Sequence, residues 1–170
     1  MRVPTRRHDF KGHASDPNLT QAKYDEMKSK LEHLKKVTRF RLMKEVATEA
    51  ENGDFSENAA YQIAKGKLRG VNDAIHQIEE DLKKVRIISN NSNKDIVSLG
   101  SLVTVLVDGK EKTYKILGSS EVDLAKNVIS HNSPIGAALM GQGVGDLVEI
   151  RVKGKTVQYK IINISYLEKI

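Results

Sequence analysis

Hydrophobic residues recur at alternating steps of three and four from residue 61 to residue 85, which predicts one long amphipathic helix. The positions are Tyr61, Ala64, Leu68, Val71, Ile75, Ile78, Leu82 and Val85. This spacing is the heptad seam of a coiled coil. An upstream run starts in the same way and then changes to steps of three before it resumes: Tyr24, Met27, Leu31, Leu34, Val37, Phe40, Met43, Val46, Ala47 and Ala50. We interpret the change as a local discontinuity of register, which a coiled coil accommodates by altering its winding.

The connection between the two runs, Asn52-Gly53-Asp54, is short enough to force the helices to fold back on each other. Gly53 is suited to end the first helix, and Asp54 or Ser56 to cap the second. Seam positions that face each other in such a hairpin have numbers that sum to about 109, as Tyr24 and Val85 do. We therefore predict an antiparallel hairpin over residues 19–88, with arms about 45 Å long. The alternative is a coiled coil that joins two chains.

The second half of the chain changes to the period of β-strands. Residues 89–98 are a predicted polar linker, and residues 99–170 hold two predicted β-hairpins, one around Asp108-Gly109 and one around Lys153-Gly154-Lys155. Between them Ser133-Pro134 marks the start of a short helix. The fold class is thus α+β: an N-terminal antiparallel α-helical coiled-coil hairpin, then a small antiparallel β domain with one short helix. Residues 1–18 are expected to be a flexible basic leader.

Composition narrows the functional classes only slightly. The chain has no cysteine, a formal net charge of +6 and 39% apolar residues. No signal peptide or run of 18 apolar residues is present, so we expect a cytoplasmic protein with no membrane association. Two of the five histidines lie in the leader with no third ligand and the other three are isolated, so all five are interpreted as surface residues.

Charge is segregated along the predicted hairpin. An acidic tip (Glu45, Glu49, Glu51, Asp54 and Glu57) is followed, further from the turn, by a basic collar (Arg41, Lys44, Lys65, Lys67 and Arg69). The alternative is that each cluster is only a solvated helix face. An acidic tip is repelled by the phosphates of a duplex. It suits a pore that contains a metal ion or a basic lining, with the collar meeting phosphates or acidic walls.

Two motifs resemble those of the Gre transcript cleavage factors of bacterial RNA polymerase. GDFSENAAY, residues 53–61, is similar to the family signature GDLSENAEY, and NVISHNSPIGAALMGQGVGDLVEI is similar to the family pattern ISxxSPIxxALxGxxxGDxVxI. The resemblance runs from about Leu19 to Leu167. It implies an FKBP-like β domain, and a coiled coil that enters the secondary channel of a backtracked polymerase and stimulates cleavage of the nascent RNA at its 3′ end.

The resemblance also implies roles for particular residues. Asp54 and Glu57 (the acid pair) match the family's catalytic tip acids, which assist a Mg²⁺ shared with the polymerase and bound only within that complex. The chain would then supply carboxylates and not be an independent nuclease, and we expect it to be a monomer. Lys65 matches a basic residue on the rod face near the transcript. Ser133, Pro134 and Ile135 are interpreted as fold and polymerase-docking residues.

Four positions depart from the family pattern without touching the acid pair. Ala50 stands where many members carry a base, and Ala60 replaces the usual glutamate of the signature. The change at Ala50 predicts a weaker contact with RNA at that position, and the change at Ala60 reduces the negative charge of the tip. Phe55 replaces a leucine, and Phe40 replaces a proline common after Arg39.

Several other functions are compatible with parts of the sequence. Taken alone, Asp54 and Glu57 form a capping box, a role that is compatible with catalysis. A related protein could bind the channel and inhibit the polymerase without cleavage. An FKBP-like chaperone or prolyl isomerase is disfavoured, because such a protein needs aromatic side chains to line a proline pocket. The only Phe, Trp or Tyr residues of the β domain are Tyr114, Tyr159 and Tyr166. A general DNA-binding or RNA-binding protein would use the collar without polymerase.

Overall fold

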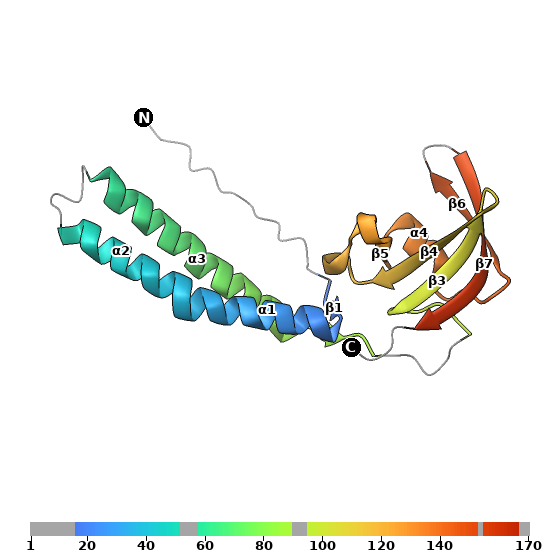
Figure 1. Ribbon diagram of the computed structural model, residues 1–170, viewed down its shortest axis with the longest axis horizontal. Helices are drawn as coiled ribbons and strands as arrows, with labels where there is room; N and C mark the ends of the chain where they lie inside the picture. The colour runs from blue at the N-terminus through green and yellow to red at the C-terminus, as the bar shows by residue number, and fades with distance from the viewer. Residues whose placement is uncertain (1–15, 52–57, 90–94, 153–154, 167–170) are drawn as a thin grey trace, which may run out of the picture.

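The computed structural model describes residues 16–51, 58–89, 95–152 and 155–166, which form two parts (Figure 1). A rod of paired helices makes the first part, and a small curled sheet makes the second. The sheet lies beyond one end of the rod, near the start of the first helix. The predicted α+β architecture, with a helical hairpin followed by a β domain, is confirmed.

Three helices and one π-helical turn build the rod. In chain order they are α1 (Gln21–His33), η1 (Leu34–Thr38), α2 (Arg39–Glu51) and α3 (Ala59–Lys84). The hydroxyl of Thr20 caps α1 by accepting from the backbone N–H of Lys23, at 3.2 Å. Ion pairs between the arms, such as that of Lys35 with Glu79, show that the first arm runs antiparallel to α3.

The register discontinuity predicted near residue 37 is a π-helical turn. The backbone N–H of Arg39 donates to the carbonyl oxygen of Leu34, five residues earlier. A π turn holds one residue more than an α turn, so the seam continues at steps of four through this stretch and not at the predicted steps of three, and it reaches Val46 and Ala50 as predicted. The seam passes through Leu34 and Thr38, which are half-buried, to Leu42, which is 4% exposed.

Four of the predicted seam positions on the first arm are therefore wrong, and one of them is Ala47, which is exposed. Val37, Phe40 and Met43 are 52%, 57% and 48% exposed, because the π turn moves them to the outside of the rod. Leu42 takes the buried place, although the sequence pattern did not select it. On α3, which has no such interruption, all of the predicted seam positions are buried or half-buried.

The β domain is one five-stranded sheet in the order β5-β4-β3-β7-β6. Its strands are β3 (Ser101–Val107), β4 (Lys110–Leu117), β5 (Val128–Ser130), β6 (Leu147–Val152) and β7 (Lys155–Tyr166). The sheet is antiparallel except at one edge, where β5 runs parallel to β4. The predicted antiparallel sheet is therefore mixed at that edge.

The predicted hairpins and short helix are present in the β domain. Asp108 and Gly109 have φ angles of 48° and 70° and connect β3 to β4, as a tight hairpin turn requires. The strands β6 and β7 pair with each other, although residues 153–154 lie outside the described residues. The helix α4 (Pro134–Leu139) is capped by Ser133, whose hydroxyl accepts from the N–H of Gly136 at 3.0 Å.

The core of the β domain lies between the sheet and α4. Its most buried side chains, each 0% exposed, are Val103, Val105, Ile116, Leu139 and Ile161. A β-carbon added at Gly136 would lie 2.1 Å from the carbonyl oxygen of Ser130, so glycine lets α4 lie directly on β5. This core holds the β domain together independently of the rod.

The base of the rod is closed by a short parallel pair, β1 (Asn18–Leu19) with β2 (Arg86–Ile87). The backbone N–H of Arg86 donates to the carbonyl oxygen of Pro17 at 2.7 Å, and Leu19 is 2% exposed. Residues 16–18 fall within the stretch expected to be a leader, and here they belong to the base of the rod.

Candidate functional site

The acid pair, Asp54 and Glu57, lies outside the described residues, so its geometry stays a prediction. The structure does describe the two helix ends that flank it. The helix α2 ends at Glu51 and α3 begins at Ala59, and both ends lie at the end of the rod away from the β domain (Figure 1). The sequence GDFSENAAY therefore connects the arms at the free end of the rod.

Asn58 joins the two arms at this free end. Its Oδ1 accepts from the backbone N–H of Tyr61 at 3.0 Å and caps α3. Its Nδ2 donates to the carbonyl oxygen of Glu49 at 2.9 Å, on the opposite arm. The cap of the second helix is thus Asn58, and not Asp54 or Ser56 as the sequence suggested. The preference of asparagine for N-caps is the signal that could have identified it.

All five residues of the basic collar are exposed and lie on facing parts of α2 and α3. The Nζ of Lys44 lies 4.9 Å from the ring centroid of Phe40, and the Nζ of Lys65 lies 5.6 Å from that of Tyr61. These rings hold the ammonium groups near the rod surface through cation–π contacts. Arg41 and Arg69 complete the collar.

Among the described residues, Lys67 is the member of the collar that forms an ion pair with an acid. Its Nζ lies 3.0 Å from a carboxylate oxygen of Glu45 on the opposite arm. The acidic tip and the basic collar therefore meet at this pair. Both side chains are well exposed, so the pair leaves the charges accessible to a partner.

The three residues expected to serve fold and docking lie at the start of α4. The hydroxyl of Ser133 donates to the carbonyl oxygen of Ser130 at 2.7 Å, in addition to capping the helix. Pro134 is exposed at the first helical position, and Ile135 is half-buried against the core. Ser133 and Ile135 thus have structural contacts, while the docking role of all three stays a prediction.

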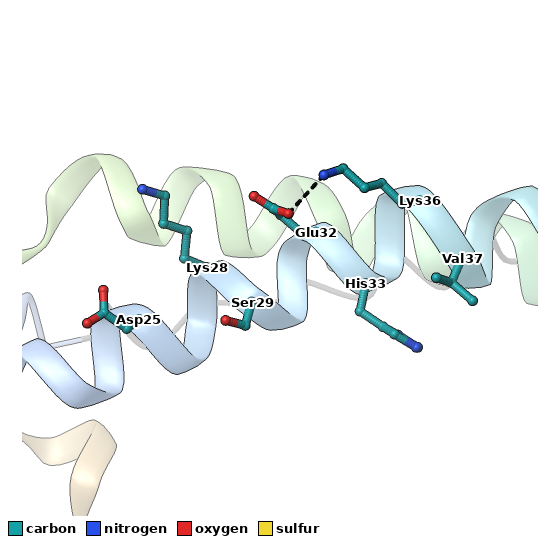
Figure 2. Close-up of a pocket in the computed structure, with 7 residues that line it drawn as sticks. All are labelled: Asp25, Lys28, Ser29, Glu32, His33, Lys36 and Val37. Carbon is teal, nitrogen blue, oxygen red and sulfur yellow. Dashed lines mark hydrogen bonds and ion pairs between the residues drawn. The ribbon is translucent and has the colours of Figure 1, made fainter.

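A hollow of about 530 Å³ runs along the outer side of α1 and η1 (Figure 2). Figure 2 shows Lys28, Glu32 and Lys36 extending to one side of the helix and His33 to the other. Glu32 is already paired with Lys36 at 2.9 Å. The side chains do not converge on a common point, so we assign no ligand to this hollow.

The described residues contain neither a metal site nor a membrane-spanning helix. Among these residues, no three His, Asp or Glu side chains lie together in a way that could hold a metal ion. The helices within them include none that is both long enough and apolar enough to cross a bilayer. The expected Mg²⁺ ligands are the acid pair, on which the described residues give no information.

Together these features define a two-domain protein in which a helical hairpin extends from a small β domain and carries a charged free end. The sequence matches two protein-family models. The model "Transcription elongation factor, N-terminal" matches residues 18–87, and the model "Transcription elongation factor, GreA/GreB, C-term" matches residues 91–166. The chain belongs to the GreA/GreB family of transcription elongation factors.

Individual relatives agree with this assignment. Transcription elongation factor GreA of Bacillus licheniformis is 36% identical over 150 residues, with 86% of this chain and 95% of the relative covered. GreA of Thermotoga neapolitana is 32% identical over 149 residues, with 86% of this chain and 96% of the relative covered. The crystal structure of the GreA factor homolog Gfh1 of Thermus thermophilus aligns with 88% of this chain and 99% of its own, at 22% identity and a TM-score of 0.40. The family assignment rests on the sequence matches.

Proposed function

We propose that this chain acts on a backtracked bacterial RNA polymerase by entering its secondary channel with the free end of the rod, and that it stimulates cleavage of the nascent RNA at its 3′ end. The supporting observation is the position of GDFSENAAY. The described helix ends on either side of it lie at the end of the rod away from the β domain. The β domain can then stay at the channel mouth while the rod reaches inward.

The acid pair is proposed to work on a Mg²⁺ ion that the polymerase shares. Carboxylate oxygens are the hard ligands that Mg²⁺ prefers, but two of them on a turn hold the ion poorly without further ligands. When bound, such an ion activates water and stabilises the leaving oxygen. The chain supplies Asp54 and Glu57 and is itself no nuclease.

The remaining roles follow from charge and position. The collar residues Arg41, Lys44, Lys65, Lys67 and Arg69 are exposed and suited to contact RNA phosphates or acidic channel walls. Ser133, Pro134 and Ile135 are proposed to support docking at the channel mouth. The chain is proposed to act as a monomer, because its hydrophobic seam is used within the hairpin.

An isomerase or chaperone function has little support from the β domain. Tyr159 is 7% exposed within the core, and burial is the main cause that raises the pKa of both Tyr114 and Tyr159. The hydroxyl of Tyr166 donates to the carbonyl oxygen of Ile96 at 2.6 Å. Tyr159 lies in the core and Tyr114 and Tyr166 pack against it, so the three rings contribute to the fold.

The proposal is tested with stalled, backtracked elongation complexes and Mg²⁺. Adding the wild-type protein should give shortened RNA that the polymerase extends again, and Asp54→Asn with Glu57→Gln should abolish the shortening. The control is Glu111→Gln, which removes one exposed carboxylate on β4, away from the free end of the rod, and should stay active. No shortening by the wild type, with slower extension, would favour the channel-binding inhibitor instead.

A further inference from the structure

The base of the rod is attached to the β domain by side chains that lie about a hundred positions apart in the sequence. Glu121, in the short helix η2 (Ser119–Glu121), accepts two hydrogen bonds from Thr20. The backbone N–H of Thr20 lies 2.6 Å from Oε1, and its hydroxyl lies 2.7 Å from Oε2. Because both carboxylate oxygens hold the same residue, the contact fixes direction as well as distance.

A second carboxylate connects the two parts in the opposite sense, since it belongs to the rod and accepts hydrogen bonds from the β domain. Asp16, at the base of the rod, accepts from the backbone N–H of Ser119 at 2.8 Å and from its hydroxyl at 3.2 Å. Its other oxygen accepts from the backbone N–H of Asn18 at 3.0 Å and from the side-chain amide at 2.8 Å. The Nδ1 of His131, in the β domain, lies 3.3 Å from the Oδ2 of Asp16. The Asp16 side chain is only 6% exposed.

The backbones of the two parts also meet without an intervening side chain. A β-carbon added at Gly118 would lie 1.9 Å from the carbonyl oxygen of Asn18. The φ angle of Gly118 is −67°, which any residue adopts, so the lack of a side chain is what this close approach requires. We call this set of contacts the base clamp: Asp16, Asn18, Thr20, Gly118, Ser119, Glu121 and His131.

The base clamp holds both arms, because β1 is paired with β2. Thr20 caps α1, and the residues just before it are hydrogen-bonded to the strand that follows α3. The backbone N–H of Ile88 donates to the carbonyl oxygen of Leu19 at 2.8 Å. A change of angle at the clamp therefore turns the whole rod.

The length of the rod amplifies small changes at its base. The helix α3 has 26 residues, which corresponds to about 39 Å at the helical rise. A rotation of about 10° at the clamp would move the free end by about 7 Å at this length. Misplacement of a catalytic group by about 1 Å can reduce a rate about a hundredfold.

We propose that Glu121, Asp16 and Gly118 are positioning residues for transcript cleavage: the base clamp sets the direction in which the β domain presents the rod, and hence where the free end arrives. This inference rests on the proposed function. None of these residues touches the reacting groups, so their loss should affect the maximal rate of cleavage more than the concentration needed for binding.

The direction of the rod is measured first, on the protein without polymerase. The chain contains no cysteine, so Asn72→Cys on α3 and Lys110→Cys on β4 give two unique sites for spin labels. We expect a narrow distance distribution in the labelled parent protein. Glu121→Ala and Gly118→Ala should broaden or shift it, while Glu111→Ala, at an exposed position of β4, should not. An unchanged distribution in both clamp variants would overturn the proposal.

Cleavage by the same variants is then measured at saturating protein. Glu121→Ala and Gly118→Ala should lower the maximal cleavage rate at least about tenfold, with a much smaller change in the half-saturating concentration. Glu121→Gln keeps an oxygen for the Thr20 N–H and should recover most of the rate, which a loss of folding would not allow. Circular dichroism confirms that each variant is folded.

The two hypotheses fail in different ways. A wild type that gives no cleavage rejects the proposed function and the positioning role with it. A wild type that cleaves, with clamp variants that cleave equally fast despite a broadened distance distribution, rejects the positioning role alone. Clamp variants that lose only affinity would show that the clamp serves docking, which also contradicts the inference.

Discussion

The side-chain amide of Asn58 lies 2.9 Å from the backbone carbonyl oxygen of Glu49, across the free end of the rod. Glu49 belongs to the last turn of α2, where carbonyl oxygens have no partner within the helix. Asn58 satisfies one of them while its Oδ1 caps α3. One side chain thus joins the end of one arm to the start of the other, on both sides of the segment that carries the acid pair.

The two bonds of Asn58 can be separated by substitution. Asn58→Ser keeps a capping oxygen and removes the bridge, so we expect it to lower the free energy of unfolding by about 1 kcal/mol. Asn58→Ala removes both bonds and should cost about 2 kcal/mol. Urea unfolding measures both values, with Asn72→Ser and Asn72→Ala at an exposed position of α3 as controls. An Asn58→Ala protein as stable as the wild type would contradict the bridge.

Because of the π turn, Leu42 should contribute more to stability than Met43, which is the opposite of what the hydrophobic pattern suggests. Leu42 is 4% exposed and Met43 is 48% exposed. Leu42→Ala should therefore lower the free energy of unfolding by about 2–5 kcal/mol, through lost burial and a cavity. Met43→Ala should change it by less than about 0.5 kcal/mol. Thermal unfolding of the pair gives the comparison, and a larger loss for Met43→Ala would mean that the seam continues without a π turn.

The rod was predictable from the sequence as far as its hydrophobic periodicity was regular. The seam of α3 was correct at each position because no irregularity interrupts it. On the first arm the steps of three at Val37, Phe40 and Met43 marked the right place but assigned the wrong face, since the π turn carries the seam through Thr38 and Leu42 before Val46 and Ala50 rejoin it as predicted. Spacing alone does not distinguish a gradual change in winding from a single wide turn.

The contacts at the base of the rod could not be predicted from local patterns. Thr20 and Glu121 are separated by 101 positions, and neither belongs to a motif that refers to the other. His131 was interpreted as a surface residue, yet it faces Asp16. Only the folding of both parts brings these groups together. The acid pair, in contrast, was identified from its sequence motif, and its role stays a prediction.

Two glycines should respond in opposite ways to alanine. A β-carbon at Gly70, on the exposed side of α3, meets nothing within 4 Å, whereas one at Gly136 would lie 2.1 Å from the carbonyl oxygen of Ser130. Gly70→Ala should raise the free energy of unfolding by about 0.5–1 kcal/mol through helix propensity. Gly136→Ala should lower it by about 1–3 kcal/mol through overpacking. Chemical denaturation followed by circular dichroism distinguishes the signs, and equal effects would contradict the close contact of α4 with β5.

The collar predicts a graded effect of lysine substitutions on cleavage. Lys67 lies 3.0 Å from a Glu45 oxygen, which offsets part of its charge, while Lys65 lies over the ring of Tyr61. Lys65→Gln should therefore raise the half-saturating concentration for cleavage more than Lys67→Gln does, and both effects should shrink at high salt. Lys112→Gln, at an exposed position of β4, is the control. A larger effect of Lys67→Gln would reverse this ranking and indicate that the Glu45 pair opens in the complex.

Asp16 should make the stability of the protein depend on pH in the acid range. Burial by itself raises the pKa of this carboxyl, but hydrogen bonds from Ser119 and Asn18 and the nearby His131 outweigh it, so the pKa lies below its ordinary value. A lowered pKa contributes stability that is fully present above the unfolded value of about 4 and is lost as the pH falls through the folded value. The wild type should thus be more stable than Asp16→Asn at about pH 6, with a difference that shrinks below about pH 4.

Urea unfolding at a series of pH values measures this difference in the free energy of unfolding, with Asp73→Asn on the exposed side of α3 as control. A difference that stays constant down to about pH 2 would show that folding does not lower the pKa of Asp16.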